Sequence, residues 1–239
     1  MRRDHRPYFI KKAYLNFQNF YAKHYLRPQF EILGKRYAFI KPWHVEIFGN
    51  PIELGDYATV VATSDNKVRL SVWPSKKGEG HIQIGDYCLI CPGVRISSAS
   101  QIRIGDNCML ASGVYITDCD WHGIYNRISI GKAIPVKIEA NVWLGDSAIV
   151  CKGVTIGENS IVGAGAVVVN SVPPNVIAAG NPARVVKSLN SEEQITPRSK
   201  WFSDPLRLFE ELDQWDREIL KDNTMLDWIR SVVAPRKGD

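Results

Sequence analysis

The sequence predicts an all-β solenoid, a parallel β-helix in which short strands stack coil upon coil. A six-residue beat of aliphatic residues predicts it, at Ile138, Leu144, Val150, Ile156, Val162 and Val168. An amphipathic helix repeats about every 3.6 residues and a strand every second residue, so this period fits neither. Gly-Asp steps also recur where each coil must turn. A sustained hexapeptide period with such turns is typical of a β-helix.

The N-terminal residues 1–44 are expected to form a cap rather than a coil. They are rich in Lys and Arg with interleaved aromatic residues, and their only acidic residues are Asp4 and Glu31. The pattern predicts a helix from Tyr8 to Tyr25 that ends before Pro28. Such a segment either covers the first coil or contacts an anionic membrane surface.

The β-helix is predicted to span residues 45–189. Its beat fails after Ile116, because the next inward position, four residues on, holds the charged Asp120. We therefore predict an extruded loop over residues 117–135. Function in a solenoid collects where the repeat is interrupted, so this loop is the first candidate for chemistry.

The C-terminal residues 190–239 are expected to form a helical extension. The step Ser203-Asp204-Pro205 is a helix start signal, and two apolar stripes follow it at helical spacing. The stripes comprise Leu206, Phe209, Leu212 and Trp215, and then Leu226, Ile229, Val232 and Val233. Because the open end of a β-helix exposes strand edges, caps are needed at both termini.

The composition narrows the classes of function. The chain has 239 residues with a net charge of +5, which is too small to indicate a nucleic-acid-binding protein. No apolar run of about 18 residues predicts a transmembrane helix. The five cysteines are odd in number, which favours a reduced, cytoplasmic protein. The five histidines have no short spacing, so no metal site is predicted.

The predicted loop contains the candidate catalytic residue, His122. Histidine is the usual general base near neutral pH. Asp118 or Asp120 is a candidate to hold the ring nitrogen that does not react, and Trp121 or Tyr125 offers a flat face to a sugar ring. The alternative is a solvent-exposed histidine beside aspartates that serve only as turn residues.

Two runs of sequence carry a family resemblance, NVWLGDSAIVCKGVTIGENSIVGAGAVVV from Asn141 and VPPNVIAAGNPARVVK from Val172. Residues 84–189 resemble hexapeptide-repeat acyltransferases, within the branch of galactoside, maltose and surface-polysaccharide O-acetyltransferases. The resemblance implies a left-handed parallel β-helix and a homotrimer. It also implies that acetyl-CoA binds in the cleft between adjacent coils.

In such an enzyme, His122 would remove the proton from an acceptor hydroxyl, and the oxygen would attack the thioester without an acyl-enzyme. The resemblance implies coenzyme contacts at Trp143, Asp146, Ala164, Asn170, Arg184 and Lys187. Arg184 and Lys187 would meet the phosphates. Asn170 marks a departure, because some relatives carry Thr-Lys where this chain has Val-Asn.

The predicted function is therefore acetyl-CoA-dependent O-acetylation of a carbohydrate hydroxyl, such as that of a lipopolysaccharide or capsule precursor. The enzyme would use no metal, and it would work in the cytoplasm or at the inner face of the membrane. Three alternatives stay open. They are an N-acetyltransferase of a nucleotide sugar or an antibiotic acetyltransferase, a non-catalytic β-helix scaffold, and a γ-carbonic-anhydrase-like metalloprotein. A panel of acceptors, coenzyme binding and metal analysis separate them.

Overall fold

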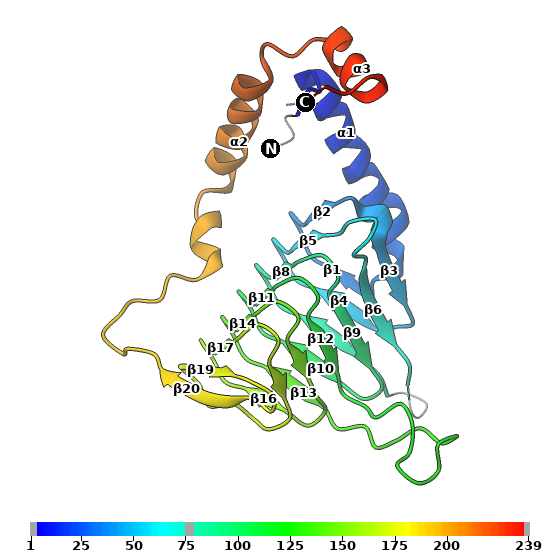
Figure 1. The fold of residues 1–239 in the computed structure, drawn as a ribbon, viewed down its shortest axis with the longest axis vertical. Helices are drawn as coiled ribbons and strands as arrows, with labels where there is room; N and C mark the ends of the chain where they lie inside the picture. The colour runs from blue at the N-terminus through cyan, green and yellow to red at the C-terminus, as the bar shows by residue number, and fades with distance from the viewer. Residues whose placement is uncertain (1–3, 75–78, 237–239) are drawn as a thin grey trace. The chain divides into compact units, whose positions relative to one another are not determined.

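Three sheets form the faces of the predicted parallel β-helix, which is left-handed, as the family resemblance implies (Figure 1). The computed structural model describes residues 4–74 and 79–236. Sheet A contains β1 (Ile32–Leu33), β4 (Ile52–Leu54), β7 (Ile82–Ile84), β10 (Ile102–Ile104), β13 (Val136–Ile138) and β16 (Thr155–Ile156). Sheet B contains β2 (Ala38–Ile40), β5 (Thr59–Val61), β8 (Leu89–Ile90), β11 (Met109–Leu110), β14 (Trp143–Leu144), β17 (Ile161–Val162), β19 (Val176–Ala179) and β20 (Arg184–Ser188). Sheet C contains β3 (Val45–Phe48), β6 (Val68–Val72), β9 (Arg95–Ser98), β12 (Tyr115–Thr117), β15 (Ile149–Val150) and β18 (Val167–Val168).

The aliphatic beat forms the core. Every beat residue from Ile138 to Val168 is buried and belongs to one continuous apolar cluster. Burying each such side chain contributes about 1.5–3 kcal/mol, so the repeat itself stabilises the stack. Cys88 and Cys108 fill small inward positions, and their thiols lie against the backbone oxygens of Gly105 and Glu139.

The Gly-Asp steps lie where the coils turn, as predicted: Gly85-Asp86 and Gly105-Asp106 at the corner between sheets A and B, and Gly145-Asp146 between sheets B and C. At the first of these corners the aspartates bond to the preceding coil: Asp106 Oδ1 accepts the backbone N–H of Asp86 at 2.8 Å. Asp86 Oδ1 accepts that of Asp56 at 2.7 Å. A Cβ at Gly85 would lie 2.2 Å from Asp106 Oδ1, so the corner has no room for a side chain.

The β-helix begins earlier than residue 45, because β1 and β2 already pair with β4 and β5. Before them, α1 (Tyr8–Tyr21) continues into a π-helix (Ala22–Leu26) and a 3₁₀ turn (Arg27–Gln29) rather than one helix to Tyr25. Ala22, Leu26 and Phe30 are buried in the core cluster. This part of the N-terminal segment therefore covers the first coil. Two more 3₁₀ turns lie at Pro42–His44 and Arg198–Phe202.

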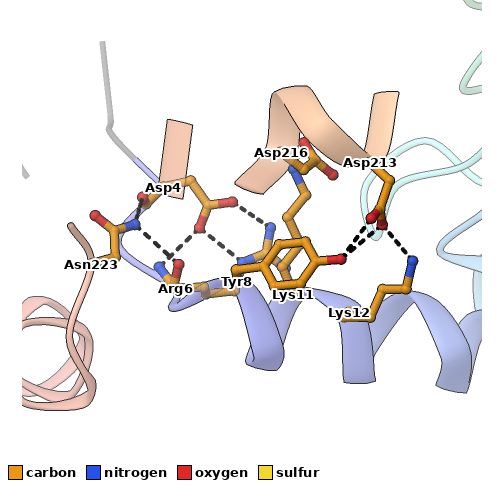
Figure 2. A network of polar contacts seen from close by, with 8 residues as sticks. All are labelled: Asp4, Arg6, Tyr8, Lys11, Lys12, Asp213, Asp216 and Asn223. Atoms are coloured by element: carbon orange, nitrogen blue, oxygen red, sulfur yellow. Dashed lines mark hydrogen bonds and ion pairs between the residues drawn. The ribbon is translucent and has the colours of Figure 1, made fainter. Parts of the chain in front are cut away.

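The chain divides into two compact units, residues 21–200 and a helical unit formed by 1–20 with 201–239. The helical unit contains α1, α2 (Pro205–Leu220) and α3 (Met225–Val233). Within it, α1 and α2 meet through polar groups (Figure 2). Lys12 and Tyr8 bond to Asp213, and Lys11 pairs with Asp216 at 2.6 Å.

Apolar side chains contribute little to the contacts of this helical unit. In its described part, only Pro7, Gln18 and Leu220 are buried, whereas the stripe residues of α2 and α3 are exposed. Their predicted packing on the coil or on a neighbouring subunit stays a prediction. No helix in the described ranges is long and apolar enough to cross a bilayer.

Candidate active site

The predicted loop is extruded as an arm that leaves sheet C after β12 and returns to sheet A at β13 (Figure 1). Backbone hydrogen bonds join its outgoing and returning segments, from Ile134 N–H to Asp118 O and from Gly131 N–H to Asp120 O, both 2.8 Å. Near the tip, Gly123 N–H donates to Ser129 O, also at 2.8 Å. The arm is therefore held in a defined shape rather than attached only at its ends.

His122 lies on this arm with its ring held in one orientation. Its Nδ1 lies 2.8 Å from the backbone oxygen of Arg127. Because a carbonyl oxygen can only accept, Nδ1 carries the hydrogen, and Nε2 of the neutral ring keeps its lone pair. The Arg127 side chain in turn donates from Nε to Ile124 O at 2.8 Å. The exposed ring can therefore accept a proton at Nε2.

Asp118 lies at the base of the arm and is completely buried. Its carboxylate accepts the Ser98 hydroxyl at 2.8 Å and the backbone N–H groups of Ala99 and Ser100 at 2.7 and 2.9 Å. In the described part of the chain, these bonds engage both of its oxygens. Asp118 thus ties the arm to the preceding coil, and its predicted role of orienting His122 stays a prediction.

Asp120 and Trp121 lie one step further along the arm. Asp120 forms an ion pair with Lys152, which lies in the turn that follows β15. Trp121 is half-buried. Sequence reasoning missed Lys152, although the register offered a signal. Since β12 pairs with β15 and Ile116 lies opposite Val150, Lys152 falls beside the start of the arm.

Two cysteines near the base of the arm are poor nucleophiles. Burial raises the pKa of the Cys119 thiol, and the nearby carboxylates of Asp118 and Asp120 raise it further. Burial likewise raises the pKa of Cys151. Both thiols therefore stay protonated at neutral pH, which argues against a covalent intermediate on cysteine at this place.

Most of the coenzyme candidates lie on sheet B or at its border with sheet C. One row across sheet B runs from Trp143 through Ile161 and Ile177 to Lys187, which the strand register places side by side. Arg184 lies on the same edge strand, β20. Their exposed side chains share the outer surface at this end of the β-helix.

Asp146 and Ala164 lie in successive turns between sheets B and C. The two turns are bonded together, since Gly165 N–H donates to Asp146 O at 2.7 Å. Asn170 follows β18 and thus lies at the corner between sheets C and A, the corner from which the arm leaves. A single chain therefore brings Asn170 to the corner of the arm, but it holds Trp143 on sheet B and Asp146 at the corner between sheets B and C.

A metal centre has no visible basis in the described residues, which contain no cluster of three or more His, Cys, Asp or Glu side chains able to hold an ion.

Two families of repeat match this chain. Residues 135–170 match the family described as bacterial transferase hexapeptide (six repeats). Residues 81–118 match the hexapeptide repeat of succinyl-transferase. The interruption between the two matches contains the arm.

Among curated proteins, the chain is 36% identical over 113 residues to the galactoside O-acetyltransferase of Escherichia coli, covering 47% of each chain. It is 49% identical over 59 residues to a putative acetyltransferase of Schizosaccharomyces pombe, covering 25% of this chain and 28% of that one. The chain thus spans about half or less of the length of these relatives.

Among solved structures, a hexapeptide-repeat acetyltransferase from Vibrio cholerae is 25% identical, with a TM-score of 0.49, covering 77% of this chain and 89% of that one. A structure of such an enzyme from Vibrio cholerae with acetyl coenzyme A is 26% identical, with a TM-score of 0.44, over 71% and 78% of the two chains.

Proposed function

We propose that this chain, whose β-helix belongs to the hexapeptide-repeat transferase family, transfers an acetyl group from acetyl-CoA to a carbohydrate hydroxyl. The observation that carries the proposal is the orientation of His122. Its Nδ1 donates to Arg127 O, which leaves Nε2 as the proton acceptor on an arm that interrupts the repeats. The relative that matches over the longest stretch reported above is named for O-acetylation of galactosides.

The chemistry is direct transfer. His122 Nε2 takes the proton of the acceptor hydroxyl while the hydroxyl oxygen forms a bond to the thioester carbon. The carbon–sulfur bond then breaks, and the CoA thiolate leaves and is protonated. A positioned general base typically accelerates such a step by about 10²–10⁴-fold. The raised thiol pKa values of Cys119 and Cys151 favour this route over an acyl-enzyme.

The coenzyme would lie along the border of sheets B and C. Trp143 offers a flat, exposed surface there, and the small Ala164 leaves space for the pantetheine arm beside Asp146. Arg184 and Lys187 are exposed and suited to the phosphates, Arg184 through its fork and Lys187 as a point charge.

A second copy of the chain completes this site in our proposal, as part of a homotrimer. In one chain, His122 lies on an arm at the corner between sheets C and A, whereas Trp143 lies on sheet B, so the arm of one copy would reach the coenzyme of the next. The tip of the arm supports this arrangement. Ile124, Tyr125 and Ile128 are 71%, 99% and 96% exposed, an unusual position for large apolar side chains unless another surface covers them.

A membrane-surface role finds less support in the N-terminal charges. Arg6 pairs with Asp4, Lys11 with Asp216 and Lys12 with Asp213. These basic groups are therefore neutralised within the helical unit, and the proposal does not depend on contact with lipid.

Calorimetric titration with CoA and acetyl-CoA tests the proposal first. Saturable binding near one coenzyme per subunit supports it, and an acceptor screen with galactosides, maltosides and acidic glycans then measures transfer. A folded protein that binds neither CoA nor acetyl-CoA at millimolar concentration contradicts it. If the enzyme acetylates amines but no hydroxyl, the acceptor is an amine and the proposed carbohydrate hydroxyl is wrong.

A further inference from the structure

Two exposed aromatic rings stand near the base of the catalytic arm, outside every site described above. Phe48 ends β3, and Trp73 directly follows β6, its neighbour in sheet C. Their ring centroids lie 4.1 Å apart with an interplanar angle of 22°, so the rings are stacked. The two side chains nevertheless stay 52% and 50% exposed. The pair thus presents flat apolar surface to the solvent.

A chain of hydrogen bonds links this stacked pair to the arm. The backbone N–H of Trp73 donates to the backbone oxygen of Ser98 at 2.8 Å, and the Ser98 hydroxyl donates to the Asp118 carboxylate at 2.8 Å. Asp118 begins the arm that carries His122. Trp73 and the arm therefore both lie at the C-terminal ends of strands in sheet C, with the coil of β9 between them.

The strand register gives the separation between Trp73 and the base of the arm. Val72 lies opposite Ser98, and Ser97 lies opposite Thr117, so the Trp73 coil is two coils from the base of the arm. Neighbouring strands are about 4.8 Å apart, which makes the separation about 10 Å. This exceeds the width of one sugar ring. A ligand that covers both places must therefore contain at least two linked sugars.

We propose that Phe48 and Trp73 form a platform for a sugar residue of an oligosaccharide acceptor, beside the residue that is acetylated. This inference rests on the proposed function and names its substrate class as a glycan of two or more residues. A pyranose has an apolar C–H face that packs on an aromatic ring while its hydroxyls stay in water. Because the two rings already stack on each other, they can bind such a face with little loss of side-chain conformational entropy.

Binding to an array of mono-, di- and oligosaccharides tests the platform directly. The full-length wild-type protein is compared with Trp73→Ala, Trp73→Phe and Phe48→Ala. We expect wild type to retain glycans of two or more residues, Trp73→Ala to lose at least tenfold in affinity, and Trp73→Phe to keep most of it. Tyr87→Ala is the matched control, because it removes a ring from the Tyr57–Tyr87 stack at another corner.

Transfer kinetics supply the second measurement. For an oligosaccharide that the array identifies, Trp73→Ala should raise KM while leaving kcat nearly unchanged, and transfer to the matching monosaccharide should not change. Equal glycan binding by wild type and Trp73→Ala overturns the platform. So does a wild-type protein that binds no glycan on the array. A change in subunit number in Phe48→Ala or Trp73→Ala also overturns it, because the rings would then belong to a contact between copies.

The two proposals fail separately. If acetyl-CoA binds but glycan binding does not depend on Trp73, the platform is wrong and the transferase stands. If a glycan binds through Trp73 but acetyl-CoA does not bind, the transferase is wrong and the aromatic pair is a sugar-binding site of another protein class.

Discussion

His122 Nδ1 lies 2.8 Å from the backbone oxygen of Arg127, so the arm itself fixes which ring nitrogen can accept a proton. In many histidine bases a carboxylate performs this task. Here the nearest carboxylates in sequence, Asp118 and Asp120, bond to the preceding coil and to Lys152. The orientation of His122 therefore depends on the folding of the arm between residues 122 and 127.

Replacing His122 tests its role as the base. We expect His122→Ala to lower kcat by about 10²–10⁴-fold, because the hydroxyl loses its proton acceptor. The affinity for acetyl-CoA should stay unchanged, which calorimetry measures alongside the rate. His24→Ala, at an exposed position in the N-terminal π-helix, is the control. Near-normal turnover in His122→Ala would show that another group takes the proton.

Asp118 should matter for stability rather than for proton transfer alone. Asp118→Ala removes the carboxylate that accepts the Ser98 hydroxyl and the N–H groups of Ala99 and Ser100. A hydrogen bond to a charged group contributes about 1.5–3 kcal/mol, so we expect a loss of at least about 2 kcal/mol in the free energy of unfolding. Urea unfolding measures it. Asp120→Ala is the matched variant, and losing its half-exposed ion pair with Lys152 should cost less than about 1 kcal/mol.

The coils were predictable because each inward position is a local property of the sequence. Ile138 in sheet A and Leu144 in sheet B belong to the same coil, so each six-residue step adds one aliphatic side chain to the core from the next sheet. The first coil also keeps this period, at Leu33, Phe39 and Val45, but the basic and aromatic residues around it resemble a surface segment.

The site was predictable only in part, because its contacts cross between coils. His122 was found from the break in the repeat. The partners of Asp118 lie 18 to 20 residues away and that of Asp120 lies 32 away, so spacing along the chain could not reveal them. The stacked rings of Phe48 and Trp73 are 25 residues apart and meet only through the register of β3 and β6.

Gly145 and Gly165, at the proposed coenzyme border, are required for different reasons: steric crowding at the first and a left-handed backbone at the second. A Cβ at Gly145 would lie 2.6 Å from the backbone nitrogen of Ala164, whereas one at Gly165 would meet nothing within 4 Å. Gly165 instead has a left-handed φ of +67°, which costs a residue with a side chain about 1–2 kcal/mol. We expect Gly145→Ala to destabilise the protein more than Gly165→Ala in urea unfolding. The reverse order would mean that the turn at Gly145 moves aside easily.

Phosphate binding by Arg184 and Lys187 predicts a marked dependence on salt. Because both side chains are exposed, their attraction to the coenzyme phosphates is screened within about 8 Å at physiological ionic strength. Arg184→Ala and Lys187→Ala should each weaken acetyl-CoA binding and reduce its salt dependence. Calorimetry at two salt concentrations measures both effects. Arg103→Ala, on the exposed face of sheet A, is the control, and an equal loss there would indicate a general charge effect.

The joint between α1 and α2 should weaken in acid. The hydrogen bond from Lys12, followed by those from Arg217 and Tyr8, holds the pKa of Asp213 well below its usual range (Figure 2). A depressed folded-state pKa stabilises the protein above the unfolded value, near pH 3.9, and the contribution is lost as pH falls below about 4. Asp213→Asn should therefore lower the melting temperature at neutral pH, with a deficit that shrinks in acid. Glu218→Gln, which removes an exposed pair with Lys221, is the control and should leave the melting temperature nearly unchanged. A deficit for Asp213→Asn that stays constant from neutral pH to about pH 3 would show that its charge does not hold the two helices together.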